Sequence, residues 1–202
     1  MNMIRLLAYI TVLSTATVQG QNLVPNPSFE EYTECPSNIS QIDRAVGWTT
    51  LSGSSDYFNV CCPNDSMSVP LNNFGYQLAA DGQAYAGVAT YVEGIPYYRE
   101  NLWAQLETQL SVGVMYHLSM KVSPGGYGNS IDNSAHWATR GIGMRLFTTQ
   151  LSPGVHQDNT ALLYMDEVLQ DTSQWTVLSR DFVADSAYGF ILIGDFFSDS
   201  LL

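Results

Sequence analysis

The stretch Tyr116-His117-Leu118-Ser119-Met120-Lys121-Val122-Ser123 exchanges apolar and polar residues at every step. Successive side chains of a β-strand point to opposite faces, so this pattern predicts a half-buried antiparallel strand. Two later stretches repeat the alternation, with apolar residues at Ile142, Met144 and Leu146 and at Trp175 and Val177. Residues 188–197 form a nearly continuous apolar run, which predicts a central strand covered on both faces.

Turn signals separate these stretches, at Asp81-Gly82, Pro124-Gly125-Gly126 and Pro153-Gly154. Residues 84–92 also alternate. Residues 102–110 fit two patterns, because Leu102, Leu106 and Leu110 have helical spacing while every even position also fits a strand; we expect a strand preceded by a short helical turn. Five or more strands without helical linkers between them predict an all-β sandwich.

The composition narrows the classes of function. The chain carries 19 acidic and seven basic residues, a net charge of −12, which disfavours binding to nucleic acid. Charged residues make up 13% and aromatic residues 12% of the chain, which indicates a packed fold rather than disorder. No segment after the first twenty residues is long and apolar enough to predict a transmembrane helix.

Residues 1–20 have the layout of a secretory signal peptide. Arg5 supplies a positive charge, Leu6 to Leu13 are mostly apolar, and Val18 and Gly20 are the small residues before a cleavage site at Gln21. A buried N-terminal strand or helix is the alternative. The sequence thus predicts one β-sandwich domain over residues 21–202, secreted or held at the cell surface.

Three cysteines, Cys35, Cys61 and Cys62, follow the predicted cleavage site. In an oxidising compartment we expect one disulfide from Cys35 to one member of the adjacent pair, which leaves one thiol over. We favour the pairing of Cys35 with Cys61. Adjacent cysteines do not easily face the same ion, so a metal site is not expected here.

An ordered series of motifs resembles a known group of domains. The series begins with Asn22-Leu23-Val24-Pro25-Asn26-Pro27-Ser28-Phe29-Glu30 and continues with Trp48, Ser55-Asp56-Tyr57-Phe58, Val69-Pro70-Leu71-Asn72, Gly82-Gln83-Ala84-Tyr85-Ala86-Gly87, Tyr98-Arg99-Glu100 and residues 113–116. The opening is similar to that of galactose-binding-like jelly-roll domains, including carbohydrate-binding modules. The whole, from about residue 22 to 199, resembles the N-terminal β-sandwich of secreted or surface proteins of gliding bacteria. Those proteins often carry a type IX secretion sorting, gliding-motility-associated or OmpA-like domain.

The resemblance implies a jelly-roll fold and a role at the outer surface. Such domains commonly hold a structural calcium near their first and last strands, and Glu30 occupies the matching place. Such domains also normally close with another strand, which we expect this sequence to lack after Leu202. A solvated pair of acids at Glu30 and Glu31 is the alternative to a calcium site.

The sequence shows no known catalytic motif. His117, His136 and His156 have no zinc-binding spacing, and no Gly-x-Ser-x-Gly elbow is present. Residues 194–199 only faintly resemble the opening of lipase-like hydrolases, because two phenylalanines separate Asp195 from Ser198. The expectation is therefore that the chain is not an enzyme, with a hydrolase as the minor alternative.

Binding is the function that the composition favours. Aromatic rings stack on the apolar faces of sugars, and amides or carboxylates orient them. The candidate residues are Tyr127, Asn129, Asp132, Trp137 and Tyr97, whose alternative role is to cover the rim of the sandwich. The predicted ligand is a glycan or another extracellular polymer. A structural or adhesion module that binds a protein partner, or presents a sorting or OmpA-like domain, is the alternative.

Overall fold

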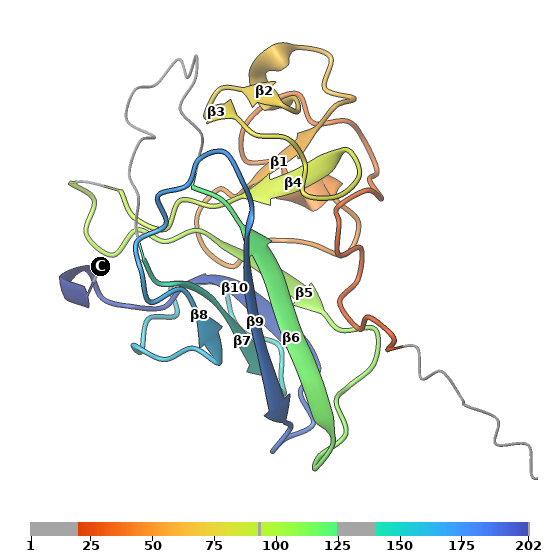
Figure 1. Cartoon of the computed structure of the whole chain (residues 1–202), viewed down its shortest axis with the longest axis vertical. Coiled ribbons are helices and arrows are strands. Elements are labelled where there is room, and N and C mark those ends of the chain that lie inside the picture. Colours follow the sequence, from red (N-terminus) through yellow and green to blue (C-terminus); the bar gives the residue numbers. More distant parts are fainter. Residues whose placement is uncertain (1–19, 93, 125–139, 202) are drawn as a thin grey trace, which may run out of the picture.

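The computed structural model describes residues 20–92, 94–124 and 140–201. The predicted signal peptide lies almost wholly outside this range. The described chain is built from strands and three 3-10 turns, as the all-β expectation requires (Figure 1). The strands are β1 (Asp56–Asn59), β2 (Leu71–Asn72), β3 (Gly75–Tyr76), β4 (Ala84–Gly87), β5 (Asn101–Gln105), β6 (Met115–Val122), β7 (Ile142–Phe147), β8 (Leu163–Tyr164), β9 (Thr176–Val183) and β10 (Phe190–Asp195).

One sheet has the order β5-β10-β7-β8, and all of its neighbours are antiparallel. The apolar run of residues 188–197 supplies its central strand, since β10 pairs with β5 through Ile193 and Leu102 and with β7 through Ile193 and Met144. The central strand predicted from this run is confirmed. The strand expected over residues 102–110 is present only in part, since β5 ends at Gln105, and no helical turn directly precedes β5 in the described chain. The 3-10 turns are η1 (Ile42–Arg44), η2 (Asp65–Met67) and η3 (Asp199–Leu201).

The strand predicted at residues 116–123 forms β6, which pairs along its whole length with β9. Figure 1 shows this two-stranded ribbon, green and dark blue, in front of the four-stranded sheet. Apolar side chains of both layers form the main core, including Leu102 and Ala104 of β5, Leu118 of β6, Met144 of β7 and Ile191 of β10. Trp48 also belongs to it. The sandwich predicted from two-residue periodicity is confirmed.

A second pair of strands, β1 and β4, joins the sandwich through Tyr57 and Ala84, which belong to the main core. The alternation of residues 84–92 gives a strand only as far as Gly87, because the following residues pair with no strand. Phe58, on the opposite face of β1 from Tyr57, packs with Met67 and Val69 in a separate apolar cluster.

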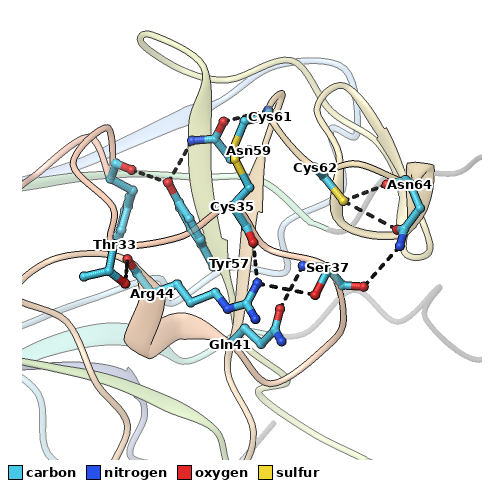
Figure 2. The surroundings of a disulfide bond; sticks show 11 residues. Thr33, Cys35, Ser37, Gln41, Arg44, Tyr57, Asn59, Cys61, Cys62 and Asn64 are labelled. Atoms are coloured by element: carbon cyan, nitrogen blue, oxygen red, sulfur yellow. Dashed lines mark hydrogen bonds between the residues drawn. A yellow bond between two sulfur atoms is a disulfide. The ribbon is translucent and has the colours of Figure 1, made fainter.

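The disulfide joins Cys35 to Cys61, as favoured from the sequence, and Cys62 is free (Figure 2). Polar contacts fix both sides of the bond. Arg44 donates from its guanidinium to the carbonyl of Cys35, and the carboxamide of Asn59 accepts from the amide of Cys61 at 2.9 Å. The bond ties the loop-rich N-terminal segment to the end of β1. Such a bond is compatible with an extracellular compartment.

Removing the disulfide should lower the free energy of unfolding. The bond closes a loop of 26 residues, and in the loop-entropy model its loss from the double variant Cys35→Ser, Cys61→Ser costs about 3 kcal/mol. Urea denaturation monitored by tryptophan fluorescence measures the change. Cys62→Ser is the matched control and should cost less than about 1 kcal/mol. Equal stability of the two variants would contradict a constraining role for the bond.

Candidate functional site

A cleft of about 1910 Å³ opens beside β6. Its walls come from β1, β4, β6, the loop before β4 and the N-terminal segment. The lining is largely apolar, with a small number of amide and carboxylate side chains. Clefts of this composition are the usual ligand sites of proteins, because apolar walls supply affinity and a few polar groups orient the ligand.

Four aromatic side chains gather at one end of the cleft, and we refer to them as the aromatic group: Phe58, Phe74, Tyr85 and Trp175. Tyr85 lies between Phe58 and Trp175, since its ring centroid is 4.9 Å from that of Phe58 and 5.7 Å from that of Trp175. Phe58 is buried, whereas the other three rings are partly exposed. The Trp175 indole N–H donates to the carbonyl of Leu78 at 2.7 Å, which fixes the ring against the loop before β4.

Two amide side chains lie beside the aromatic group in the cleft lining. The Asn72 carboxamide donates to the Tyr85 hydroxyl at 2.7 Å, and the Gln77 carboxamide oxygen accepts from the Ser123 hydroxyl at 2.8 Å. Burial raises the pKa of Tyr85 to about 12, so its hydroxyl stays neutral at physiological pH. This end of the cleft therefore offers flat apolar faces together with neutral hydrogen-bonding groups.

The carboxylate of Asp56 also lines the cleft, and it is 8% exposed. Asp56 shares a face of β1 with Phe58, because residues two apart in a strand point the same way. Its Oδ1 accepts from the amide of Ser40 at 2.7 Å. Burial raises the pKa of Asp56 to about 7, and the neighbouring charge of Glu100 adds to the effect. Asp56 is thus a carboxyl group that is partly protonated near neutral pH.

Glu100 is another carboxylate of the cleft, and it accepts more hydrogen bonds than Asp56 does. Its Oε1 accepts from the Ser54 amide at 3.0 Å, the Ser54 hydroxyl at 2.7 Å and the Tyr98 hydroxyl at 2.8 Å, while its Oε2 accepts from the Ala89 amide at 2.8 Å. Asp56 and Glu100 thus differ in their partners: donors from three residues hold Glu100, whereas the described partner of the Asp56 carboxyl group is the Ser40 amide.

Gly87 keeps the space in front of Asp56 open. It lies directly opposite Asp56 in the β1–β4 register. A Cβ at this position would approach Phe58 Cε2 to 2.7 Å and Asp56 Cβ to 3.7 Å. Glycine is thus required for close packing across this strand pair.

Of the five residues predicted to bind a ligand, the structure describes Tyr97 alone. Tyr127, Asn129, Asp132 and Trp137 lie outside the described residues. Tyr97 is 62% exposed, its amide donates to Asp199 Oδ2 at 3.2 Å, and it does not line the cleft.

Glu30, predicted as a calcium ligand, accepts instead from the amide of Gln83 at 2.8 Å and packs against Gly82. Among the residues that the structure describes, no group of three or more His, Cys, Asp or Glu side chains could hold a metal ion. The described side chains therefore do not fit a calcium site by themselves, and structural calcium stays a prediction. His117 pairs with the exposed Asp181 at 2.6 Å.

The aromatic group and Asp56 were missed from the sequence. Tyr85 and Trp175 are about 90 residues apart in the chain, so only the packing of β9 against the loop before β4 brings them together. A signal for Asp56 does exist, because an acidic residue opens the otherwise buried stretch Asp56-Tyr57-Phe58. Buried carboxylates are rare unless they are paired or functional.

No helix in the described part of the chain has the length and apolar character needed to span a membrane. No protein-family model and no curated protein matches the sequence. Among solved structures, the chain is similar to the Stig cyclase Fisc from Fischerella sp. TAU, solved in complex with (3Z)-3-(1-methyl-2-pyrrolidinylidene)-3H-indole. The likeness has a TM-score of 0.56 at 13% sequence identity and covers 86% of this chain and 87% of the cyclase chain.

This likeness contradicts the expectation that the chain is not an enzyme. The cyclase is an enzyme, so a chain of this fold can support catalysis. At this identity the likeness establishes the fold alone. The chain shares the β-sandwich fold of a cyclase.

The raised pKa of Asp56 should make stability depend on pH. The unfolded chain releases this proton near the ordinary pKa of 3.8, whereas the folded chain keeps it up to about pH 7. The free energy of unfolding therefore falls as the pH rises through this window. Asp56→Asn keeps an acceptor for the Ser40 amide and removes the charge. The variant should exceed the native chain in stability by about 4 kcal/mol at pH 8 and match it near pH 4.

Urea denaturation of both proteins from pH 4 to pH 8 measures this difference. The pKa of Asp195 is also raised, to about 6 by burial, but Asp195 is present in both proteins and cancels in the comparison. Parallel curves of unfolding free energy against pH for the two proteins would show that the pKa of Asp56 is not raised in the folded chain.

Proposed function

We propose that the chain is an extracellular β-sandwich that binds a glycan or a related extracellular polymer at the aromatic end of its cleft. The observation that carries this proposal is the meeting of partly exposed rings, Tyr85 and Trp175, with the carboxamides of Asn72 and Gln77 in one concave surface. Sugar rings present apolar C–H faces and polar edges, and this surface offers a complement to both.

The place of action belongs to the same proposal. The Cys35–Cys61 disulfide is compatible with secretion. The resemblance of the sequence to surface proteins of gliding bacteria supports a position at the cell surface or outer membrane. A net charge of −12 supports a neutral or cationic polymer as the ligand rather than nucleic acid.

A glycan array probed with residues 21–202 tests the binding proposal. The native chain should bind a defined set of sugars, and Trp175→Ala should lower the affinity about tenfold, because an aromatic contact is worth about 1.4 kcal/mol. Trp175→Phe keeps a ring and should retain most of the binding. Tyr97→Ala removes an exposed ring outside the cleft and should leave the affinity unchanged. Absence of binding to every sugar, or equal losses for Trp175→Ala and Tyr97→Ala, would refute the proposal.

The position of Asp56 favours a second candidate function, which is acid catalysis on the bound ligand. Asp56 Oδ2 has no hydrogen-bond partner among the described residues, and the group carries a proton near neutral pH. The Stig cyclase, a catalyst that binds an indole compound, supports the use of this fold for chemistry on ring compounds. On a glycoside, Asp56 gives its proton to the leaving oxygen, while water adds its hydroxyl group to the anomeric carbon and its proton restores the carboxyl group.

Hydrolysis of 4-nitrophenyl glycosides measures this activity. Asp56→Asn should lower the rate about 100-fold while sugar binding persists, since general acids contribute about that much or more. The native rate should fall as the pH rises above about 7, where Asp56 loses its proton. A rate that is insensitive to Asp56→Asn would remove this residue from the chemistry.

A further inference from the structure

One edge of β6 is unpaired in the described chain. β9 takes up the other edge over all eight residues, from Met115 opposite Val183 to Val122 opposite Thr176. No other described strand pairs with β6, and Figure 1 shows β9 along only one side of it. An unpaired edge presents a row of backbone N–H and C=O groups that a further strand can satisfy.

The cleft follows this edge. Every residue of β6 lines it, including side chains that point to opposite faces of the ribbon. A cleft that contacted only the side chains of one face would be lined by every second residue, so its continuous contact with β6 is what a cleft along the strand edge gives.

The floor of the cleft beside this edge is apolar. Leu102, Leu106, Leu146 and Ile193, which belong to the main core or pack against it, reach its surface, and Leu146 and Ile193 are only partly buried. A strand laid along β6 places every second side chain on this floor and the others toward solvent. The apolar floor of the cleft and the unpaired backbone edge of β6 together match a polypeptide better than a sugar. A sugar cannot satisfy an alternating row of backbone donors and acceptors.

The charge of the cleft indicates the character of that strand. The described lining residues include three carboxylates, Asp56, Asp81 and Glu100, against one ammonium group, that of Lys121. The whole chain is strongly acidic as well. The net charge of the chain therefore favours a partner strand that carries basic residues, whereas a second copy of the chain is disfavoured by repulsion.

We propose that the free edge of β6 receives an extended strand of another polypeptide, with apolar side chains at every second position and basic residues among the positions between them. This is addition of a strand to a sheet edge, in which the main chain provides affinity and the alternate side chains provide specificity. The interaction is independent of the glycan proposal, since it uses the edge of β6 rather than the aromatic group.

A nine-residue peptide, acetyl-Lys-Val-Thr-Val-Lys-Val-Thr-Val-Lys-amide, is a direct probe. With the peptide at ten times its Kd, hydrogen exchange should slow by about tenfold at those β6 amides that point away from β9. Amides in the β5–β10 pairing should not change. No binding, or protection spread evenly over the chain, overturns the proposal. Self-association of the free chain in sedimentation, with the same protection, assigns the edge to a second copy and also overturns it.

Two modified peptides test the pairing itself. Successive amides of a strand point to opposite edges, so N-methyl groups on all valines or on all other residues block opposite edges of the peptide. One of the two should lose binding and the other should keep it. Equal behaviour of both modified peptides excludes edge pairing.

A change in the protein tests the apolar floor. Leu146→Glu places a charge under the inward side chains and should abolish peptide binding, while Val183→Glu, at an exposed position outside the cleft, should preserve it. Retention of binding by Leu146→Glu overturns the proposal. Trp175→Ala should leave peptide binding intact, so the glycan and strand proposals fail separately.

Discussion

The stacking of the β6–β9 ribbon on the inner face of the four-stranded sheet is the contact on which the remaining structure depends. Ile191 lies at its centre, fully buried, on a strand that is hydrogen-bonded along both edges. Leu118 of β6 meets this surface from the opposite layer. Because the ribbon has only two strands while the sheet below it has four, β6 is left with an open edge above an apolar floor. The cleft is a consequence of that unequal stacking.

The buried charged side chains differ in the hydrogen bonds that offset the free-energy cost of their burial. Glu100 is surrounded by donors from Ser54, Tyr98 and Ala89, which satisfy its charge. Arg99 turns the other way, is 2% exposed, and donates to the carbonyl of Phe197 and to Asp199. Asp56 accepts from Ser40, but its burial, together with the neighbouring charge of Glu100, raises its pKa. The protonation chemistry of the cleft follows from this burial.

Periodicity was a reliable guide wherever a strand is covered on one face or both. Residues 116–123 and 188–197 form β6 and the central β10 because their patterns match a half-buried and a fully covered strand. Residues 84–92 show the limit of the same rule. Their alternation continues beyond Gly87, but the β1–β4 pairing ends there, and the carbonyl of Ala89 accepts instead from the amide of Glu100 at 3.0 Å. The candidate site was less predictable, because its ring pairs join segments far apart in the chain.

Alternation, turn residues and cysteine count were sufficient by themselves to predict an all-β sandwich with one disulfide from Cys35 to a member of the adjacent pair Cys61 and Cys62, because these features depend on local geometry and on a small number of possible pairings. Tertiary structure alone decided which side chains meet in the cleft, since Asp56, Tyr85 and Trp175 come from three separate strands or loops. It also decided that Asp56 is buried, which raises its pKa. Burial and hydrogen bonding depend on the whole fold, and no local pattern encodes them.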